Sequence, residues 1–329
     1  MQKVKIGVVI HTNLREQLFT SEDWVRLQSL GEVIATDSPT PISTEAACEL
    51  LNECEIGVGS WNTPYPNSAI LASCPQLRLW EHTAGTVKYM FGAHMEGSSL
   101  QIASCKGAIA DSVAEMVLGE ILLGLRGVFE NAAENRKGIP GKPKQMRTLA
   151  GSFIGIIGAS EVGRRVIRLL RAFPCRIGLY DPFCTPQQAQ ELGVEQMEDL
   201  EALCRRSDVV SLHVPDLPET VHMMNATLFQ AMKPDAIFIN SARGRSVDEK
   251  ALIAELEKGR LFAFLDVSDP EPTPADSPLR SLPNVVYTSH IAGPPTVFLG
   301  KQAVDDIEAY LQGGSPSCIV LSETLGRIA

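Results

Sequence analysis

Three polar residues in the second half of the sequence have side chains suited to binding a carboxylate and moving a proton. They are Arg243, Glu271 and His290, and each follows a short apolar run that predicts a buried strand. Ligands bind at the carboxyl ends of the strands in open α/β sheets, so we expect the three side chains at one sheet edge. Arginine can hold a carboxylate by two parallel hydrogen bonds, and histidine can exchange a proton near neutral pH. A carboxylate beside the histidine can fix its tautomer.

The stretch Phe153–Asp181 has the organisation of a nucleotide site. An apolar run over 153–157 predicts a strand, the turn 158–163 begins and ends with glycine, and an amphipathic helix pattern follows. A second apolar run ends at Asp181, eighteen residues after Gly163, near the spacing expected for an acid that binds ribose hydroxyls. Strand, glycine turn, helix, strand and acid together form a dinucleotide-binding fingerprint in its required context. The unpaired N–H groups at the helix start would face the pyrophosphate.

The fingerprint departs from its usual form at one position. The turn is G-x-S-x-x-G, with Ser160 in place of the second glycine, between Gly158 and Gly163. That glycine normally lets the backbone approach the phosphates closely. A serine adds a Cβ atom there and also offers a hydroxyl donor. A glycine turn alone is weak evidence, because helix–strand packing could also account for its two glycines, so the flanking strand and acid strengthen the assignment.

Composition places the chain among globular proteins. Its 329 residues suffice for two domains, and 44% of them are apolar and 21% charged. The net charge of −10 and the lack of a long basic run argue against a nucleic-acid partner. Eight cysteines without metal-ligand spacing are expected to be reduced, as in a cytoplasmic protein without a metal site. We expect neither a signal peptide nor a membrane span, because a cleavage site and a sufficiently long apolar segment are missing.

Apolar runs alternate with helical patterns along the whole chain, which predicts two parallel α/β units of similar size. Besides the fingerprint, the expected strands are 5–10, 33–35, 56–59, 77–80, 100–104, 209–214, 236–240, 261–267 and 285–288. The expected helices are 21–30, 43–52, 67–73, 111–126 with Asp111 as its cap, 197–205, 218–224, 226–232, one from a Ser246–Glu249 capping box to Lys258, and 296–311. The polar stretch 130–147 predicts an irregular surface connection.

Several separate motifs together resemble those of the D-isomer-specific 2-hydroxyacid dehydrogenases. They are Val113-Ala114-Glu115, GIIGASEVG, Leu212-His213-Val214-Pro215, MKPDAIFINSARG, LDVSDPEP and SHIAG. The resemblance covers most of residues 50–312 and is strongest over 149–293. It implies a Rossmann NAD-binding domain, residues 106–297, inserted into a flavodoxin-like substrate domain made of residues 1–105 and 298–329. It also implies a homodimer, with the 111–126 region as a candidate interface.

The resemblance implies an NAD-dependent interconversion of a small 2-oxo acid and its (R)-2-hydroxy acid. Arg243 would bind the substrate carboxylate and polarise the carbonyl, His290 would transfer the proton, and Glu271 would orient and charge His290. Asp181 would repel the extra phosphate of NADP, and the loop 59–66 carries no basic residue, so NAD and unphosphorylated acids are expected.

The resemblance also assigns the remaining site residues. The substrate residues that it implies, besides Arg243 and His290, are Ser60, Trp61 and, through their backbone amides, Thr83, Ala84 and Gly85. The cofactor residues that it implies are Gly158, Ser160, Glu161, Val162, Gly163, Asp181, His213, Val214, Pro215, Ser241, Ala242, Asp266 and Gly293.

Simpler interpretations stay open for single residues. Arg243 alone suits an ion pair on a loop, His290 a hydrogen-bonded core histidine, and Glu271 a solvated carboxylate between prolines. A structural role and a position beside the cofactor are equally consistent with His213, as are pocket lining and core packing with Trp61.

Two alternatives concern the whole chain. The first is a non-catalytic NAD(H)-sensing protein, as in the corepressors that resemble this family, and turnover of 2-oxo acids would separate it from an enzyme. The second is a formate dehydrogenase; that branch is similar but has glutamine beside the histidine, so Glu271 argues against it.

Overall fold

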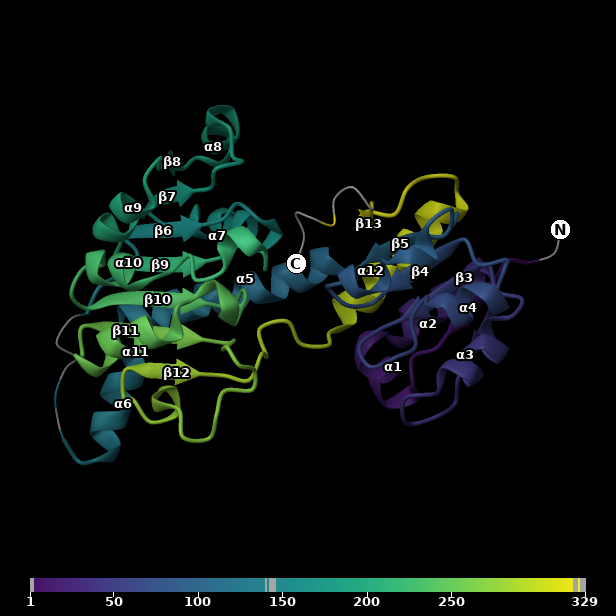
Figure 1. Cartoon of the computed structure of the whole chain (residues 1–329), viewed down its shortest axis with the longest axis horizontal. Helices are drawn as coiled ribbons and strands as arrows, with labels where there is room; N and C mark the ends of the chain where they lie inside the picture. The colour runs from purple at the N-terminus through teal and green to yellow at the C-terminus, as the bar shows by residue number, and fades with distance from the viewer. Residues whose placement is uncertain (1–2, 140, 142–145, 322–324, 326–329) are drawn as a thin grey trace. The chain divides into compact units, whose positions relative to one another are not determined.

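The computed structural model describes residues 3–139, 141, 146–321 and 325 (Figure 1). The chain divides into two compact units: unit 1 comprises Met1–Ile109 and Pro294–Ala329, and unit 2 comprises Ala110–Gly293. The first division point lies inside helix α5 (Lys106–Leu125). Each unit contains one largely parallel sheet with helices, so the predicted α/β fold class is confirmed.

The sheet of unit 1 has the order β13-β5-β4-β3-β1-β2, in which β1 to β5 are parallel and β13 pairs antiparallel with β5. The order 2-1-3-4-5 of its parallel strands is that of flavodoxin-like sheets. Its strands are β1 (Lys5–Val8), β2 (Glu32–Ala35), β3 (Ile56–Gly59), β4 (Leu79–His82), β5 (Gln101–Ser104) and β13 (Ile319–Val320).

The C-terminal segment completes the core of unit 1. Helix α12 (Val297–Leu311) buries Leu299, Val304 and Ile307 in one cluster with N-terminal side chains such as Ile6 and Leu18. The segment from Pro294 onward is thus part of unit 1.

The sheet of unit 2 has the order β12-β11-β10-β9-β6-β7-β8, with every pair parallel. This is the doubly wound 3-2-1-4-5-6 order of Rossmann domains with one further strand. Figure 1 shows the arrowheads of β6, β7 and β12 at one edge, where the loops with the candidate site begin. The strands are β6 (Phe153–Ile157), β7 (Arg176–Tyr180), β8 (Glu195–Gln196), β9 (Val209–Leu212), β10 (Ala236–Asn240), β11 (Leu261–Leu265) and β12 (Val285–Tyr287).

The central strands of unit 2 are buried on both faces. Every residue of β6, β9, β10 and β11 is buried, which is why these segments are continuous apolar runs and not alternating ones. The other helices of the chain are α1 (Thr12–Leu18), α2 (Ser21–Leu30), α3 (Thr44–Leu51), α4 (Ser68–Ser73), α6 (Val128–Arg136), α7 (Glu161–Leu170), α8 (Pro186–Leu192), α9 (Leu200–Arg206), α10 (Ala226–Ala231) and α11 (Glu249–Glu257).

Two predictions near the first division point are wrong. Helix α5 begins at Lys106, so Asp111 lies inside it and does not cap it. The Asp111 carboxylate instead accepts a hydrogen bond from Arg165 Nε at 2.6 Å. The predicted irregular stretch 130–147 begins within a helix, α6, whereas residues 140 and 142–145 lie outside the described part of the chain.

Local capping explains three further differences in element bounds. Asp248 caps α11 by accepting from Ala251 N at 3.1 Å, so the predicted Ser246–Glu249 capping box is wrong. The predicted helix 218–224 is reduced to a single 3-10 turn, Pro218–Thr220. Helix α8, which we did not predict, begins with a capping box between Thr185 and Gln188.

Three further observations concern the part of the chain that the structure describes. All eight cysteines are free. No group of three or more His, Cys, Asp or Glu side chains in the described ranges could hold a metal ion. None of the helices there has both the length and the apolar character of a membrane span.

Candidate active site

The glycine turn of unit 2 packs tightly against its neighbours. Gly158 has φ +96°, and a Cβ atom built on it would lie 2.8 Å from the carbonyl oxygen of His213. A Cβ atom on Gly163 would lie 2.1 Å from the Gly158 carbonyl oxygen, which holds the start of α7 against the turn. Both outer glycines of the fingerprint are therefore required by the backbone itself.

Ser160, the residue in the place of the second glycine, caps helix α7. Its hydroxyl oxygen accepts a hydrogen bond from Gly163 N at 3.3 Å, and its backbone is extended, with φ −65° and ψ 178°. The hydroxyl keeps its own hydrogen for another acceptor. The N-cap role was not foreseen, although a serine before a helix pattern is a known capping signal.

Asp181 ties the end of β7 to the glycine turn. One carboxylate oxygen accepts from Ala159 N at 2.6 Å, and the other accepts from Phe183 N at 2.8 Å. A carboxylate has about four lone-pair positions, so acceptor capacity remains for ribose hydroxyls. The glycine turn, the N-terminus of α7 and this acid therefore fit a dinucleotide in the Rossmann manner.

His213 is a buried, neutral side chain next to the turn. Its Nε2 atom lies 2.9 Å from Ser211 Oγ, and burial lowers the pKa of His213 to about 3. Its backbone carbonyl is the group against which Gly158 packs. The other residues predicted for the cofactor follow strands at the same edge of the sheet: Glu161 and Val162 in the first turn of α7, Val214 and Pro215 after β9, Ser241 and Ala242 after β10, and Gly293 at the end of unit 2.

The segment that carries Arg243 is held by Asn240, the last residue of β10. The buried Asn240 side chain donates to the Arg243 carbonyl and accepts from Ala242 N, both at 3.0 Å. We did not foresee this role, although an asparagine that ends a buried apolar strand is a signal for it. The Arg243 guanidinium is half-buried and donates to the Ala242 carbonyl at 2.7 Å.

The electrostatics of Arg243 reflect its neighbours. Burial lowers the pKa of Arg243, while the Asp216 and Glu271 carboxylates oppose this shift. A guanidinium has the highest pKa of the ionisable side chains, so it stays charged at neutral pH. Glu271 is thus close enough to Arg243 to act on it, and the structure brings together the carboxylate and the arginine that the sequence predicts.

Glu271 and His290 form a hydrogen-bonded pair. His290 Nδ1 donates to Glu271 Oε1 at 2.8 Å, and the side chains are 48% and 40% exposed. Because Nδ1 faces the carboxylate, Nε2 is the nitrogen left to exchange a proton with a bound molecule. His290 adopts a left-handed backbone, φ +55°, which is uncommon for residues other than glycine.

Asp266, the residue after β11, holds the loop that carries His290. Its backbone carbonyl accepts from His290 N at 2.8 Å. Its buried carboxylate accepts from Thr288 Oγ1 and Ile291 N at 2.7 Å each, and from Ala292 N at 2.8 Å. Asp266 therefore fixes the unusual backbone of His290, a role that we did not predict for it.

The residues predicted to bind the substrate through unit 1 lie in the loops after β3 and β4. Thr83 N already donates to the Gly59 carbonyl at 2.8 Å, and Ala84 N to the His82 carbonyl at 2.7 Å. The backbone amides of Thr83, Ala84 and Gly85 form the predicted substrate cradle. Among the described residues, only the Gly85 amide of these three has no internal hydrogen-bond partner.

Two side chains near this cradle are engaged inside unit 1. Ser60 Oγ donates to the Thr83 carbonyl at 3.1 Å and is buried. Trp61 packs against the core of unit 1, which favours the packing interpretation of this residue.

Comparison with known proteins identifies the family. Residues 118–292, more than half of the chain, match the D-isomer specific 2-hydroxyacid dehydrogenase NAD-binding domain. A glyoxylate reductase of Korarchaeum cryptofilum is 30% identical over 294 residues, which cover 87% of this chain and 88% of that enzyme. A D-3-phosphoglycerate dehydrogenase of Methanocaldococcus jannaschii is 36% identical over 191 residues, but these cover 57% of this chain and only 36% of that enzyme.

A solved structure shows the same fold over nearly the whole chain. The apo D-mandelate dehydrogenase of Rhodotorula graminis has a TM-score of 0.79 at 22% identity and covers 97% of this chain and 98% of its own. These relatives are reductases and dehydrogenases, so they give no support to the corepressor alternative. The chain therefore belongs to the D-isomer-specific 2-hydroxyacid dehydrogenase family and is an NAD-dependent oxidoreductase that interconverts 2-oxo and 2-hydroxy acids.

Proposed function

We propose that Arg243, His290 and Glu271 carry out the reduction of a small, unphosphorylated 2-oxo acid to its (R)-2-hydroxy acid. The observation that carries this proposal is the 2.8 Å hydrogen bond between His290 Nδ1 and Glu271 Oε1, beside the charged guanidinium of Arg243. All three groups follow neighbouring strands at the edge of the sheet where nucleotides bind in Rossmann domains.

Each side chain has a defined task in this reaction. Arg243 binds the substrate carboxylate and stabilises charge that develops on the carbonyl oxygen. His290 donates a proton from Nε2 to that oxygen, and Glu271 holds Nδ1 so that Nε2 keeps this orientation. Bound NADH supplies the hydride. In the oxidation direction His290 takes the proton back from the hydroxyl group.

Replacement of Arg243 by alanine tests this assignment. We expect kcat/KM for the best 2-oxo acid to fall by about 10²–10³-fold, as for removal of one stabiliser of transition-state charge. The NADH dissociation constant should stay within about threefold. Arg245→Ala is the matched control, because Arg245 is exposed and pairs with Asp216 at 3.2 Å. An Arg243→Ala enzyme with most of the wild-type activity on every accepted acid would overturn the assignment.

The substrate class is a second part of the proposal. Unit 1 serves as the substrate domain, and its loop 59–66, which follows β3, contains no lysine or arginine. A phosphorylated acid would lack a cationic partner in this loop, whereas glyoxylate, the substrate in the name of one relative, needs none. A panel of 2-oxo acids followed by NADH absorbance tests this. A strong preference for a phosphorylated acid would contradict it.

We also propose that the protein is a homodimer that works in the cytoplasm. Unit 2 exposes several apolar side chains on and after α5 and α6, and the eight free cysteines of the chain suit a reducing compartment. In light-scattering chromatography, Val128→Glu should lower the molar mass from that of a dimer to that of a monomer. Val25 is an exposed valine of unit 1, and Val25→Glu should leave the mass unchanged. A wild-type mass of one chain would contradict the dimer. The exposed apolar residues are Leu123, Val128, Phe129, Ile139 and Met146.

A further inference from the structure

The loops that carry Arg243 and Glu271 touch each other at one point. Gly244 packs on the backbone of Ser268: a Cβ atom built on Gly244 would lie 2.0 Å from the Ser268 carbonyl oxygen. No other residue type fits there without a shift of one loop. The two segments after β10 and β11 are thus set against each other by their backbones.

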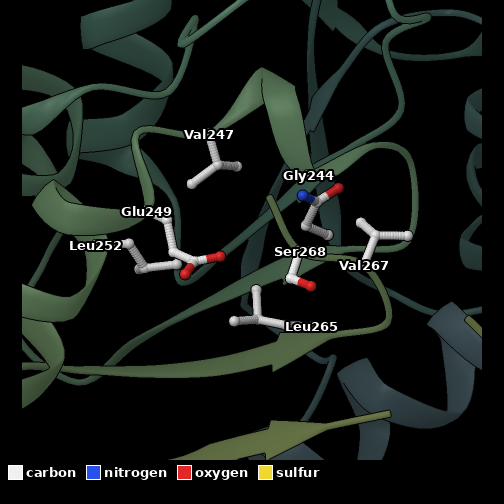
Figure 2. A pocket seen from close by; sticks show the side chains of 8 residues that line it. Gly244, Val247, Glu249, Leu252, Leu265, Val267 and Ser268 are labelled. Carbon is white, nitrogen blue, oxygen red and sulfur yellow. The ribbon is translucent and has the colours of Figure 1, made fainter. Parts of the chain in front are cut away.

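A small cavity lies beside this contact (Figure 2). Its volume is about 10 Å³, at the lower limit of the space that holds one water molecule. The polar side chains around it come from Asn240, Glu249 and Ser268, and the remainder of its lining is largely apolar. Figure 2 shows one carboxylate oxygen of Glu249 on the side of Ser268. The cavity is too small for a substrate or cofactor, so it belongs to the packing between the loops.

Glu249 reaches from its helix to the loop of Glu271. It is the first residue of α11, and its Oε2 atom accepts a hydrogen bond from Asp269 N at 3.3 Å. The next residue, Pro270, has no amide hydrogen, so Asp269 N is the nearest backbone donor before Glu271. Ser268 Oγ donates to the Pro270 carbonyl at 2.9 Å, which anchors the same segment from the other side.

We propose that Glu249 is a positioning residue for the reaction: by holding the Asp269 amide it places Glu271 against His290. The inference rests on the proposed roles of Glu271 and His290. This role requires a side chain as long as that of glutamate and an acceptor oxygen at its end. Burial raises the pKa of Glu249, which means that its negative charge is costly at this position. A neutral acceptor of the same length should therefore serve as well.

A competing explanation is that Glu249 only stabilises α11. A carboxylate in the first turn of a helix interacts favourably with the helix dipole. That role depends on the negative charge and not on the length of the side chain, so two variants separate the explanations. Glu249→Asp keeps the charge and is one methylene shorter, whereas Glu249→Gln keeps the length and loses the charge.

We expect Glu249→Asp to lower kcat about three- to tenfold, the range for loss of one hydrogen bond, with KM and the NADH dissociation constant within about twofold. Glu249→Gln should keep the wild-type kcat within about twofold. Aspartate is favoured in a first helical turn, so the shortened variant should fold, which thermal melting checks. Glu257→Asp, an exposed acid near the end of the same helix, is the matched control and should change nothing.

A double-mutant cycle shows whether Glu249 acts through Glu271. In a Glu271→Gln background, Glu249→Asp should have no further effect beyond about twofold. Three outcomes would each overturn the inference. They are a kcat that falls in Glu249→Gln but not in Glu249→Asp, a wild-type kcat in both variants, and effects of Glu249→Asp and Glu271→Gln that are additive. If Glu271→Gln lowers kcat while Glu249→Asp does not, only this inference fails. If Glu271→Gln itself has wild-type kcat, the proposed function fails with it.

Discussion

Glu120 should make the stability of unit 2 depend on pH. Its side chain lies on α5, is 8% exposed, and its Oε2 atom has no hydrogen-bond partner among the described residues. Burial, and to a smaller extent the Asp266 carboxylate, raises the pKa of Glu120 from 4.5 to about 8. At neutral pH the carboxyl group is therefore protonated in the folded protein and ionised in the unfolded chain.

The size of the effect follows from proton linkage. Between about pH 4.5 and 8 the folded protein binds one more proton than the unfolded chain, so stability falls by about 1.4 kcal/mol per pH unit as pH rises. The contribution is fully present below about pH 4.5 and is lost as pH rises through about 8. At pH 7 the loss is about 3 kcal/mol. Glutamine is neutral at every pH, so Glu120→Gln should remove this dependence.

Urea unfolding of wild type and Glu120→Gln between about pH 5 and 8.5 measures the effect. The three tryptophans, Trp24, Trp61 and Trp80, all lie in unit 1, so far-UV circular dichroism is the signal that reports on unit 2. The free energy of unfolding, variant minus wild type, should increase with pH by about 1 kcal/mol or more per unit. Glu115→Gln, exposed on the same helix, should differ from wild type by less than about 0.5 kcal/mol. A difference for Glu120→Gln that stays constant with pH would refute the reasoning.

Three predictions concern the cofactor and the proton. Ser160→Gly removes the cap of α7 but opens space at the turn, so NADH affinity should change by less than about tenfold in calorimetry; loss of binding would make the serine an essential ligand. Asp181 should repel the extra phosphate of NADPH, so kcat/KM should be higher with NADH, and equal values would contradict this. His290→Asn should lower kcat by about 10²–10⁴-fold while NADH still binds. A variant that kept more than half of the wild-type rate would exclude His290 as the proton donor.

The sequence predicts the sheets and the edge that carries the chemistry because both depend on local patterns. Strands β6 and β10 are continuous apolar runs, which a parallel sheet buried on both faces requires. Since the carboxyl ends of parallel strands share one edge, the sequence pattern alone predicts that Arg243 and His290 lie at the same edge. The hydrogen bond between Glu271 and His290 follows from the same placement.

The details that the sequence does not predict arise from contacts between distant segments. Asn240 and Asp266 resemble ordinary strand-end residues, and only the fold shows that they bind the Arg243 and His290 loops. Helix α5 begins at Lys106, and the side chain of Gln302, distant in the sequence, accepts a hydrogen bond from Ala108 N in its first turn at 2.9 Å, which no local pattern indicates. In the predicted substrate cradle, the Thr83 amide donates a hydrogen bond to the carbonyl of Gly59, the last residue of β3. No local sequence pattern indicates this bond.

The discontinuity of unit 1 has a consequence during synthesis on the ribosome. Helix α12 covers apolar side chains such as Ile6 and Leu18, yet it is translated only after the whole of Ala110–Gly293. At about 5–20 residues per second, the N-terminal segment waits about 10–40 s for this cover. Unit 2 is continuous and can fold as soon as it has left the exit tunnel. During this time, while unit 2 is still being synthesised, the apolar face of the first hundred residues stays open to chaperones.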